Sequence, residues 1–351
     1  MSENRSKKYM LRCLDLAAKA EGLTYPNPMV GAVLVHDDKI IGEGYHLKSG
    51  GPHAEVIAID SVRDKSLLPD SELFVSLEPC SHFGKTPPCT DLIIEKRIPR
   101  IIIGTSDTSM HVAGNGIKKL TDSGREVVTG VMEKECRRIN RRFFTFHEKK
   151  RPYITLKWAQ SADGFMDIVR AAGSAAGPHW ISGKPERVLV HKWRSEEQAI
   201  LVGAGTVRND NPLLNVRYWS GADPLKLILS NSGELGKYLT LNETNGTVIV
   251  FTGMRGEKSG NAVLVKLRED TPAAMQIADH LYKQGIQSLL IEGGARVLEH
   301  FISSGIWDEA RIFTGKADFK NGIKAPAVTG NFYAGSDFES TRLEAFMNDQ
   351  C

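Results

Sequence analysis

The chain has 351 residues, of which 41% are apolar and 25% charged, and 45 basic against 42 acidic side chains give a net charge of +3. A chain of this length usually folds as more than one domain, and so small a charge argues against a strong field for nucleic acid or an acidic membrane. The N-terminus is polar, no apolar run reaches about eighteen residues, and five cysteines do not suggest a disulfide framework, so we expect a protein of the reducing cytoplasm without a membrane span.

The first half alternates apolar segments with helical patterns. In chain order we expect a helix around 10–18, a hairpin over 29–45 with its turn at Asp37 and Asp38, a helix from His53, a strand over 72–77, a helix from Cys89, a strand over 100–104, a short helix over 117–120, a strand over 125–131 and a helix that includes 136–144. Strands separated by helices of this length favour a mostly parallel sheet covered on both faces.

A basic stretch, 137–151, follows and leads into Pro152. It is either a solvated helix face running into a linker or an RNA-binding arm, although the aromatic side chains that an arm needs for stacking are few. We place the domain boundary near residue 148.

The second half also has an α/β pattern. We expect strands over 153–159, 199–203, 225–230, 247–251, 288–294 and 309–315, and helices over 186–193, 273–285 and 295–305. The predicted domains are therefore 1–147 and 151–349.

A cluster of metal-binding residue types lies in the first half. His53 begins a predicted helix, Cys80 follows a strand, and Cys89 begins the next helix. One imidazole and two thiolates suit zinc, and a set of three protein ligands leaves a position open for water, as in catalytic sites. Zinc makes its bound water acidic enough to give hydroxide near neutral pH.

Glu55 lies two residues after His53 and has the position of a general acid–base rather than a ligand. Zinc nucleobase deaminases carry the same H-x-E with a later P-C-x-x-C, and their glutamate moves protons. This chain has Pro79-Cys80, but eight residues rather than two separate its cysteines.

The sequence resembles the bifunctional riboflavin-biosynthesis deaminase–reductases in the segments PNPMVGAVLV, GEGYH, GGPHAE, LEPCSHFGKTPPC and VAGNGI. The resemblance implies an α/β chain with an N-terminal cytidine-deaminase-like three-layer domain and a C-terminal dihydrofolate-reductase-like domain. The long cysteine spacer is itself a trait of that family, whereas nucleic-acid deaminases keep the short one. The implied reactions are deamination of 2,5-diamino-6-(5-phosphoribosylamino)pyrimidin-4(3H)-one and NADPH-dependent reduction of its ribosyl group to ribityl.

The resemblance also implies site residues. In the deaminase half, Asn27, His82, Lys85 and Thr86 would contact substrate; Asn27 has the alternative role of a turn residue before Pro28. In the reductase half, the cofactor contacts would be Ala159, Trp180, Thr206, Asp210, Asn231, Gly293 and Gly294, and the substrate contacts Lys157, Asp163, Arg194, Leu214, Arg217 and Glu292. Gly293 and Gly294, between a strand and a helix, would let backbone N–H groups approach a pyrophosphate.

Two of these assignments have alternatives, and the chain departs from the family pattern near the reductase site. Trp180 is also suited to core packing, and Arg194 to the exposed end of a helix. The family usually has an arginine and a small hydroxyl or aliphatic residue after Asp-Gly, where this chain has Phe165 and Met166, and Pro178 takes the position of a substrate-binding serine. The small residues of 171–177 suit an active-site lid.

In the first half, the family's D-P-N-P stretch is replaced by the residues at 107–110. Two rival functions stay open at this point. One is a nucleic-acid base deaminase with an added domain, and the other is a deaminase whose reductase half is only structural. We expect small-molecule substrates, zinc and NADPH as cofactors, no nucleic-acid or membrane partner, and a homo-oligomer.

Overall fold

The computed structural model describes residues 3–83, 87–108, 114–170, 177–231, 246–253 and 262–349. The chain divides into two compact units, which join between Lys150 and Arg151. Within the described ranges no helix is both long and apolar enough to cross a membrane.

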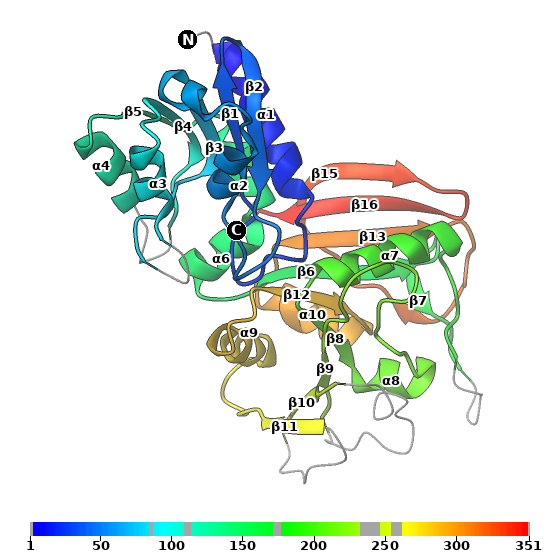
Figure 1. Cartoon of the computed structure of the whole chain (residues 1–351). Coiled ribbons are helices and arrows are strands. Elements are labelled where there is room, and N and C mark those ends of the chain that lie inside the picture. Colours follow the sequence, from blue (N-terminus) through cyan, green and yellow to red (C-terminus); the bar gives the residue numbers. More distant parts are fainter. Residues whose placement is uncertain are drawn as a thin grey trace. The chain divides into compact units, whose positions relative to one another are not determined.

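The first unit is built on a five-stranded sheet with the order β2-β1-β3-β4-β5 (Figure 1). Its strands are β1 (Gly31–His36), β2 (Lys39–Tyr45), β3 (Glu72–Leu77), β4 (Arg100–Thr105) and β5 (Glu126–Thr129). Its helices are α1 (Glu3–Ala18), α2 (Ala54–Ser61), α3 (Cys89–Glu95), α4 (Asn115–Asp122), α5 (Glu133–Ile139) and α6 (Arg141–Lys149), with a 3₁₀ turn at Lys65–Asp70.

Two apolar clusters confirm that both faces of this sheet are covered. On one face Tyr9 and Met10 of α1 and Cys136 of α5 pack on β1, β3 and β4. On the other face α2, α3 and α4 cover the same strands, with Ala58 and Leu120 among the buried side chains. Three layers result, and the predicted zinc ligands lie before α2, after β3 and at the first residue of α3.

The predicted hairpin of β1 and β2 is confirmed, but the pairing of β1 with β3 departs from the predicted mostly parallel sheet. Asp37 and Asp38 both have positive φ, as a tight two-residue hairpin turn requires. The resulting β1 is antiparallel to β2 and also to β3, whereas β3, β4 and β5 are parallel.

The predicted helix over 136–144 is interrupted at Asn140, whose side chain accepts from the Met29 N–H and donates to the Met29 carbonyl, both at 2.8 Å. The basic stretch is not a uniformly solvated face. Arg142 is 4% exposed and pairs with Glu21, and Arg151 forms two bonds to Asp308. These arginines stabilise the fold and are not free for RNA.

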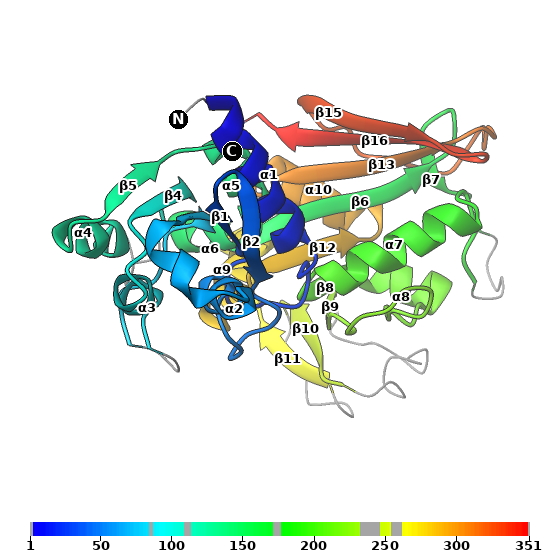
Figure 2. The same ribbon diagram turned by 45° about the horizontal axis from the view of Figure 1, so that its top comes forward.

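The second unit contains a nine-stranded sheet with the order β11-β10-β9-β8-β12-β6-β13-β16-β15 (Figure 2). Its strands are β6 (Tyr153–Gln160), β8 (Ala199–Gly203), β9 (Leu225–Leu229), β10 (Val248–Thr252), β11 (Ala262–Lys266), β12 (Ser288–Glu292), β13 (Glu309–Gly315), β15 (Gly330–Asp337) and β16 (Thr341–Asn348); β7 (Phe165–Asp167) and β14 (Ile323–Lys324) form a separate pair. Its helices are α7 (Lys184–Glu196), α8 (Ala204–Asp210), α9 (Ala273–Lys283) and α10 (Ala295–Ser303).

From β11 to β13 the neighbouring strands are parallel, and the last two pairings are antiparallel. The hairpin of β15 and β16 was not predicted, because β15 is almost wholly exposed and is rich in Gly, Asn and Ser rather than β-branched residues. The carboxyl ends of β6, β8 and β12 meet at one edge of the sheet, which is where parallel α/β sheets bind ligands.

Candidate active sites

The three predicted metal ligands lie together in the first unit. His53 precedes the first residue of α2, Cys80 lies three residues after β3, and Cys89 is the first residue of α3. Their ligand atoms lie within 4.8 Å of one another; His53 Nδ1 is 3.2 Å from Cys89 Sγ and 3.5 Å from Cys80 Sγ. One nitrogen and two sulfurs converging on a point fit a zinc ion with an open fourth position.

The electrostatics of this cluster favour a bound cation. A hydrogen bond from Cys89 lowers the pKa of Cys80 to about 4, and His53 acts in the same direction. The same contact with Cys80 raises the pKa of the Cys89 thiol, so the two sulfurs share one proton. Metal binding would release this proton, and both sulfurs would then serve as thiolate ligands.

Glu55 is 3% exposed and does not belong to the three-residue ligand set. Burial, followed by repulsion from the Cys80 thiolate, raises its pKa to about 7. A carboxyl group with a pKa near the working pH is suited to accept and return a proton.

His46 is a residue that sequence reasoning quoted within a motif but did not assign. It is 2% exposed, and its Nδ1 lies 3.0 Å from the Pro52 carbonyl, which can only accept. Nδ1 therefore carries the proton, and Nε2 accepts from the Asn27 amide at 3.1 Å. This chain of bonds leaves the Asn27 Oδ1 as the group offered to a ligand.

Glu78 is a second unassigned residue, although it stands in the motif Leu77-Glu78-Pro79-Cys80. Its 5%-exposed carboxylate accepts four backbone N–H groups, those of Asp107, Gly114, Gly116 and Ile117. Gly116 packs so closely that an added Cβ would lie 2.1 Å from the Pro79 carbonyl oxygen. Glu78 thus ties the beginning of α4 to the turn that carries Cys80.

The spacer between the cysteines is only partly described. Lys85 and Thr86 lie outside the described residues, and His82 is exposed. Their expected contacts with substrate stay predictions.

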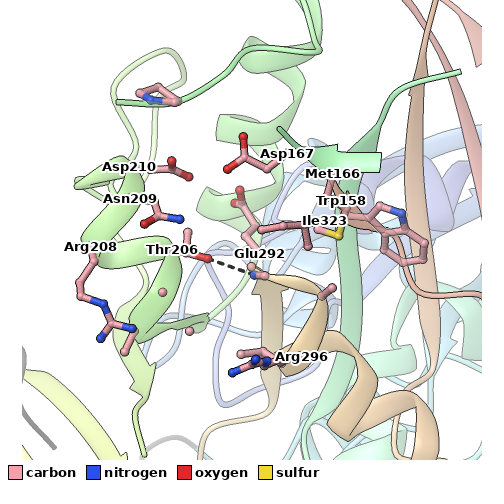
Figure 3. A pocket seen from close by; sticks show the side chains of 18 of the residues that line it. Trp158, Met166, Asp167, Thr206, Arg208, Asn209, Asp210, Glu292, Arg296 and Ile323 are labelled. Carbon is pink, nitrogen blue, oxygen red and sulfur yellow. Dashed lines mark hydrogen bonds between the residues drawn. The ribbon is translucent and has the colours of Figure 1, made fainter. Parts of the chain in front are cut away.

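A cavity of about 650 Å³ lies at the carboxyl ends of β6, β8 and β12 in the second unit (Figure 3). Of the residues predicted for the reductase, its lining includes Lys157, Ala159, Trp180, Thr206, Asp210, Asn231, Glu292, Gly293 and Gly294. Asp163, Arg194, Leu214 and Arg217 do not line it. Segments separated by more than a hundred residues thus meet in one pocket.

A buried ionic cluster joins Lys157 and Glu292, which line this cavity, to Arg194, which does not. Arg194 donates from Nε and Nη2 to the two oxygens of Glu292, at 2.6 and 3.0 Å, and Lys157 Nζ lies 3.6 Å from Glu292 Oε2. Burial would raise the pKa of Glu292, but the Arg194 and Lys157 cations outweigh it and lower the pKa to about 2. Burial also lowers the pKa of Lys157, which has Glu292 as its counter-ion.

The structure separates the alternatives for two side chains. The Arg194 side chain is 11% exposed, so it is not an exposed residue at a helix end. Trp180 is 54% exposed and lines the cavity, with the Arg187 guanidinium 4.7 Å from its ring centre, so it is not a core residue.

The predicted substrate contacts outside the cavity have other partners. Asp163 accepts from Ser161 Oγ and from the Phe319 and Lys320 N–H groups. Leu214 is buried with φ of 51°, and the Arg217 N–H donates to His191 Nδ1 at 3.0 Å.

The predicted glycine turn lies between β12 and α10. The Gly294 N–H donates to Thr206 Oγ1 at 3.0 Å, which is the dashed line in Figure 3. A Cβ on Gly293 would lie 3.2 Å from the backbone of Val202 and Gly203, so a side chain has little room there. Two exposed arginines that sequence reasoning missed, Arg208 and Arg296, also line the cavity, and Figure 3 shows both on the side away from Asp167 and Asp210.

Comparison with known proteins identifies a domain in each unit. Residues 3–105 match the cytidine and deoxycytidylate deaminase zinc-binding region, and residues 152–315 match the RibD C-terminal domain. The chain is 40% identical over 317 residues to the riboflavin biosynthesis protein RibD of Aquifex aeolicus, covering 88% of this chain and 86% of that one. The RibD of Bacillus amyloliquefaciens is 37% identical, with 87% and 83% covered.

A solved structure extends the likeness to the whole chain. The diaminohydroxyphosphoribosylaminopyrimidine deaminase/5-amino-6-(5-phosphoribosylamino)uracil reductase of Thermotoga maritima has a TM-score of 0.88 at 37% identity, with 99% of both chains covered. With a cytidine-deaminase-type zinc domain and a reductase domain in one polypeptide, this chain belongs to the bifunctional deaminase–reductases of riboflavin biosynthesis.

Proposed function

We propose that the chain first deaminates 2,5-diamino-6-(5-phosphoribosylamino)pyrimidin-4(3H)-one and then reduces the ribosyl group of the product to ribityl with NADPH. The observation that carries this proposal is the presence, in one polypeptide, of a converging zinc-ligand set beside a buried glutamate and a cavity at the glycine turn after β12. The activity named for the Thermotoga relative supports the substrate.

In the deaminase, His53, Cys80 and Cys89 would hold the zinc, which supplies an acidic bound water. Glu55 would take a proton from the attacking water and deliver protons to a ring nitrogen and the departing amine. The pKa of about 7 allows it to carry that proton in either direction near neutral pH. Asn27 would accept a hydrogen bond from the substrate through Oδ1, and His82, Lys85 and Thr86 would contact its phosphoribosyl end.

In the reductase, Glu292 with Lys157 would bind the sugar, because a carboxylate and an ammonium held together present an acceptor and a donor to hydroxyl groups. Arg194 has both of its carboxylate-facing nitrogens bonded to Glu292, so orienting that group is its first role. Asp163, Leu214 and Arg217 stay as predicted substrate contacts.

The nicotinamide cofactor would lie along Ala159, Trp180, Thr206, Asp210, Asn231, Gly293 and Gly294. We propose NADPH rather than NADH, because Arg208 and Arg296 offer two exposed guanidinium groups to an additional phosphate. The cofactor supplies the hydride, and the protein contributes placement and charge.

The rival functions are less well supported. The basic stretch that an RNA-binding deaminase would use has Arg142 and Arg151 paired with Glu21 and Asp308. A merely structural reductase half would have no reason to keep a cation–carboxylate–cation cluster against a cavity of about 650 Å³.

We also propose a cytoplasmic location, since Cys13, Cys80, Cys89 and Cys136 are all free thiols. The homo-oligomer stays a prediction, which light scattering of the purified chain would test.

The function is tested by giving the purified chain the diaminopyrimidine substrate with NADPH or NADH. We expect ammonia release followed by NADPH oxidation, and slower oxidation of NADH. Failure to release ammonia would refute the deaminase assignment, and failure to oxidise either cofactor after ammonia release would refute the reductase assignment.

A further inference from the structure

Asp210, the predicted cofactor contact at the end of α8, has a partner that neither the sequence analysis nor the family comparison assigns. Arg170 Nη2 lies 3.1 Å from Asp210 Oδ1, and the same guanidinium contacts Asp167 Oδ2 from Nε at 3.0 Å and from Nη2 at 2.9 Å. All three residues line the reductase cavity, and Figure 3 shows the carboxylates of Asp167 and Asp210 on the same side of it.

The Arg170 guanidinium is held from other directions as well. Its Nη1 donates to the Gly177 carbonyl at 2.6 Å and to the Asn209 carbonyl at 3.3 Å, and the Gly177 N–H also donates to Asn209, at 2.7 Å. A planar guanidinium with bonds on three sides has a fixed orientation. Arg170 lies three residues after β7, the strand in which this chain departs from the family pattern at Phe165 and Met166.

Charge decides what this arrangement does to Asp210. Burial raises the pKa of Asp210 to about 6; Arg170 opposes the rise and Asp167 adds to it. Without Arg170, a half-buried carboxyl group beside a second carboxylate would be largely neutral at pH 7. The other titratable side chains of the cavity lining are Lys157, Glu292, His179, His300, Arg208 and Arg296, of which Glu292 is paired with Lys157 and Arg194.

We propose that Arg170 is a positioning residue of the reductase, which keeps Asp210 ionised and oriented as a hydrogen-bond acceptor for a hydroxyl or amide donor of the nicotinamide cofactor. Asp167 has the opposite effect on Asp210, because it shares the same guanidinium and its negative charge disfavours the ionised form of Asp210. This inference rests on the proposed cofactor site.

The test measures the affinity of the full-length, zinc-loaded protein for NADP⁺ by calorimetry between pH 5 and 8. The 2′-phosphate of the ligand titrates in the same range, but it does so equally for every variant, so differences between variants report on the protein. In Arg170→Met, the pH below which the affinity for NADP⁺ falls should be about one unit higher than in the wild type. Binding at pH 7 should be several-fold weaker.

Asp167→Asn should move the same midpoint downward, because it removes a like charge and leaves the Arg170–Asp210 pair in place. Arg170→Lys keeps the charge without the fork, so its midpoint should lie nearer to the wild type than that of Arg170→Met. In an Asp210→Asn background, Arg170→Met should cause no further shift.

Opposite shifts for Arg170→Met and Asp167→Asn support the inference. Weaker binding with an unchanged midpoint in both variants would mean that Arg170 only maintains the fold and would overturn it, as would shifts in the same direction. Tryptophan fluorescence checks folding, and if Arg170→Met does not fold, the comparison of Asp167→Asn and Arg170→Lys decides. If the wild type does not bind NADP⁺ at any pH, the proposed cofactor site fails together with the inference.

Discussion

The two candidate sites are built in different ways. The candidate zinc site takes its four principal residues from two short motifs: His53 and Glu55 at the beginning of α2, and Cys80 after β3 with Cys89 at the beginning of α3. The reductase cavity draws on segments from Lys157 to Ile323, and two members of an ionic cluster, Lys157 and Glu292, line it. One site depends on the chemistry of a few neighbouring atoms, and the other on long-range packing.

This difference predicts different responses to substitution. A change at the candidate zinc site should remove the chemistry while largely preserving the fold, because His53 and Cys80 are only partly buried and lie outside the strands and helices. A change at the buried cluster of the reductase should affect stability and activity together, because a charge left alone in the interior is costly.

The largest effect is expected for Glu55→Gln, which keeps the shape of the side chain but cannot carry a proton. Deamination should fall by about 10²–10⁴-fold or more, and zinc content should not change. Cys80→Ser is the matched comparison, since it should lose both deaminase activity and bound zinc. Ammonia release and metal analysis of the purified variants measure this, and equal zinc loss in both would make Glu55 a ligand.

The second-largest effect is expected for Glu292→Gln, because this change leaves the Lys157 and Arg194 cations near each other without a counter-ion. We expect loss of NADPH oxidation and a fall of about 3 kcal/mol in the free energy of unfolding of the second unit. The chain's five tryptophans all lie between Trp158 and Trp307, so their fluorescence reports on this unit alone.

Glu299→Gln, on the exposed surface of α10, is the control for Glu292→Gln and should change neither quantity. Unaltered stability in Glu292→Gln would show that the cluster is not coupled to the fold.

A smaller effect is expected for Glu78→Gln, which replaces one accepting oxygen by a donor facing backbone N–H groups. The first unit should lose about 1–3 kcal/mol of stability and release zinc to a chelator faster. Glu95→Gln, at the exposed end of α3, should behave as the wild type. Identical zinc release in the two variants would refute the coupling of Glu78 to the Cys80 turn.

The smallest effect concerns pH. Burial, followed by the Arg194 and Arg217 cations, lowers the pKa of His191 to about 4. The unfolded chain therefore binds a proton that the folded one does not between about pH 6.5 and 4, so stability should fall as the pH falls through that window. Denaturant titrations followed by tryptophan fluorescence should show a weaker pH dependence in His191→Gln, and an unchanged dependence would exclude His191 as its source.

Much of the zinc site could be predicted from the sequence, because each ligand adjoins a clear element boundary. His53 before α2, Cys80 after β3 and Cys89 at the beginning of α3 all lie where the apolar pattern changes. The roles of His46 and Glu78 could not be predicted, since their partners are backbone groups and an amide that only the folded chain brings near.

The reductase half was harder to predict for a physical reason. A buried Glu292 between two cations looks, in the sequence, like an ordinary acid after a strand, and Arg194 lies almost a hundred residues away from it. The antiparallel pairing of β1 with β3 and the exposed β15 likewise depend on partners that no local pattern specifies.

We expect one chain to perform two separate reactions in a fixed order. The most direct measurement gives Glu55→Gln protein NADPH together with either the diaminopyrimidine substrate or its deaminated product. We predict NADPH oxidation at the wild-type rate with the deaminated product and almost none with the diaminopyrimidine. Two results would contradict this expectation: oxidation of NADPH with the diaminopyrimidine, or no oxidation of NADPH with either compound.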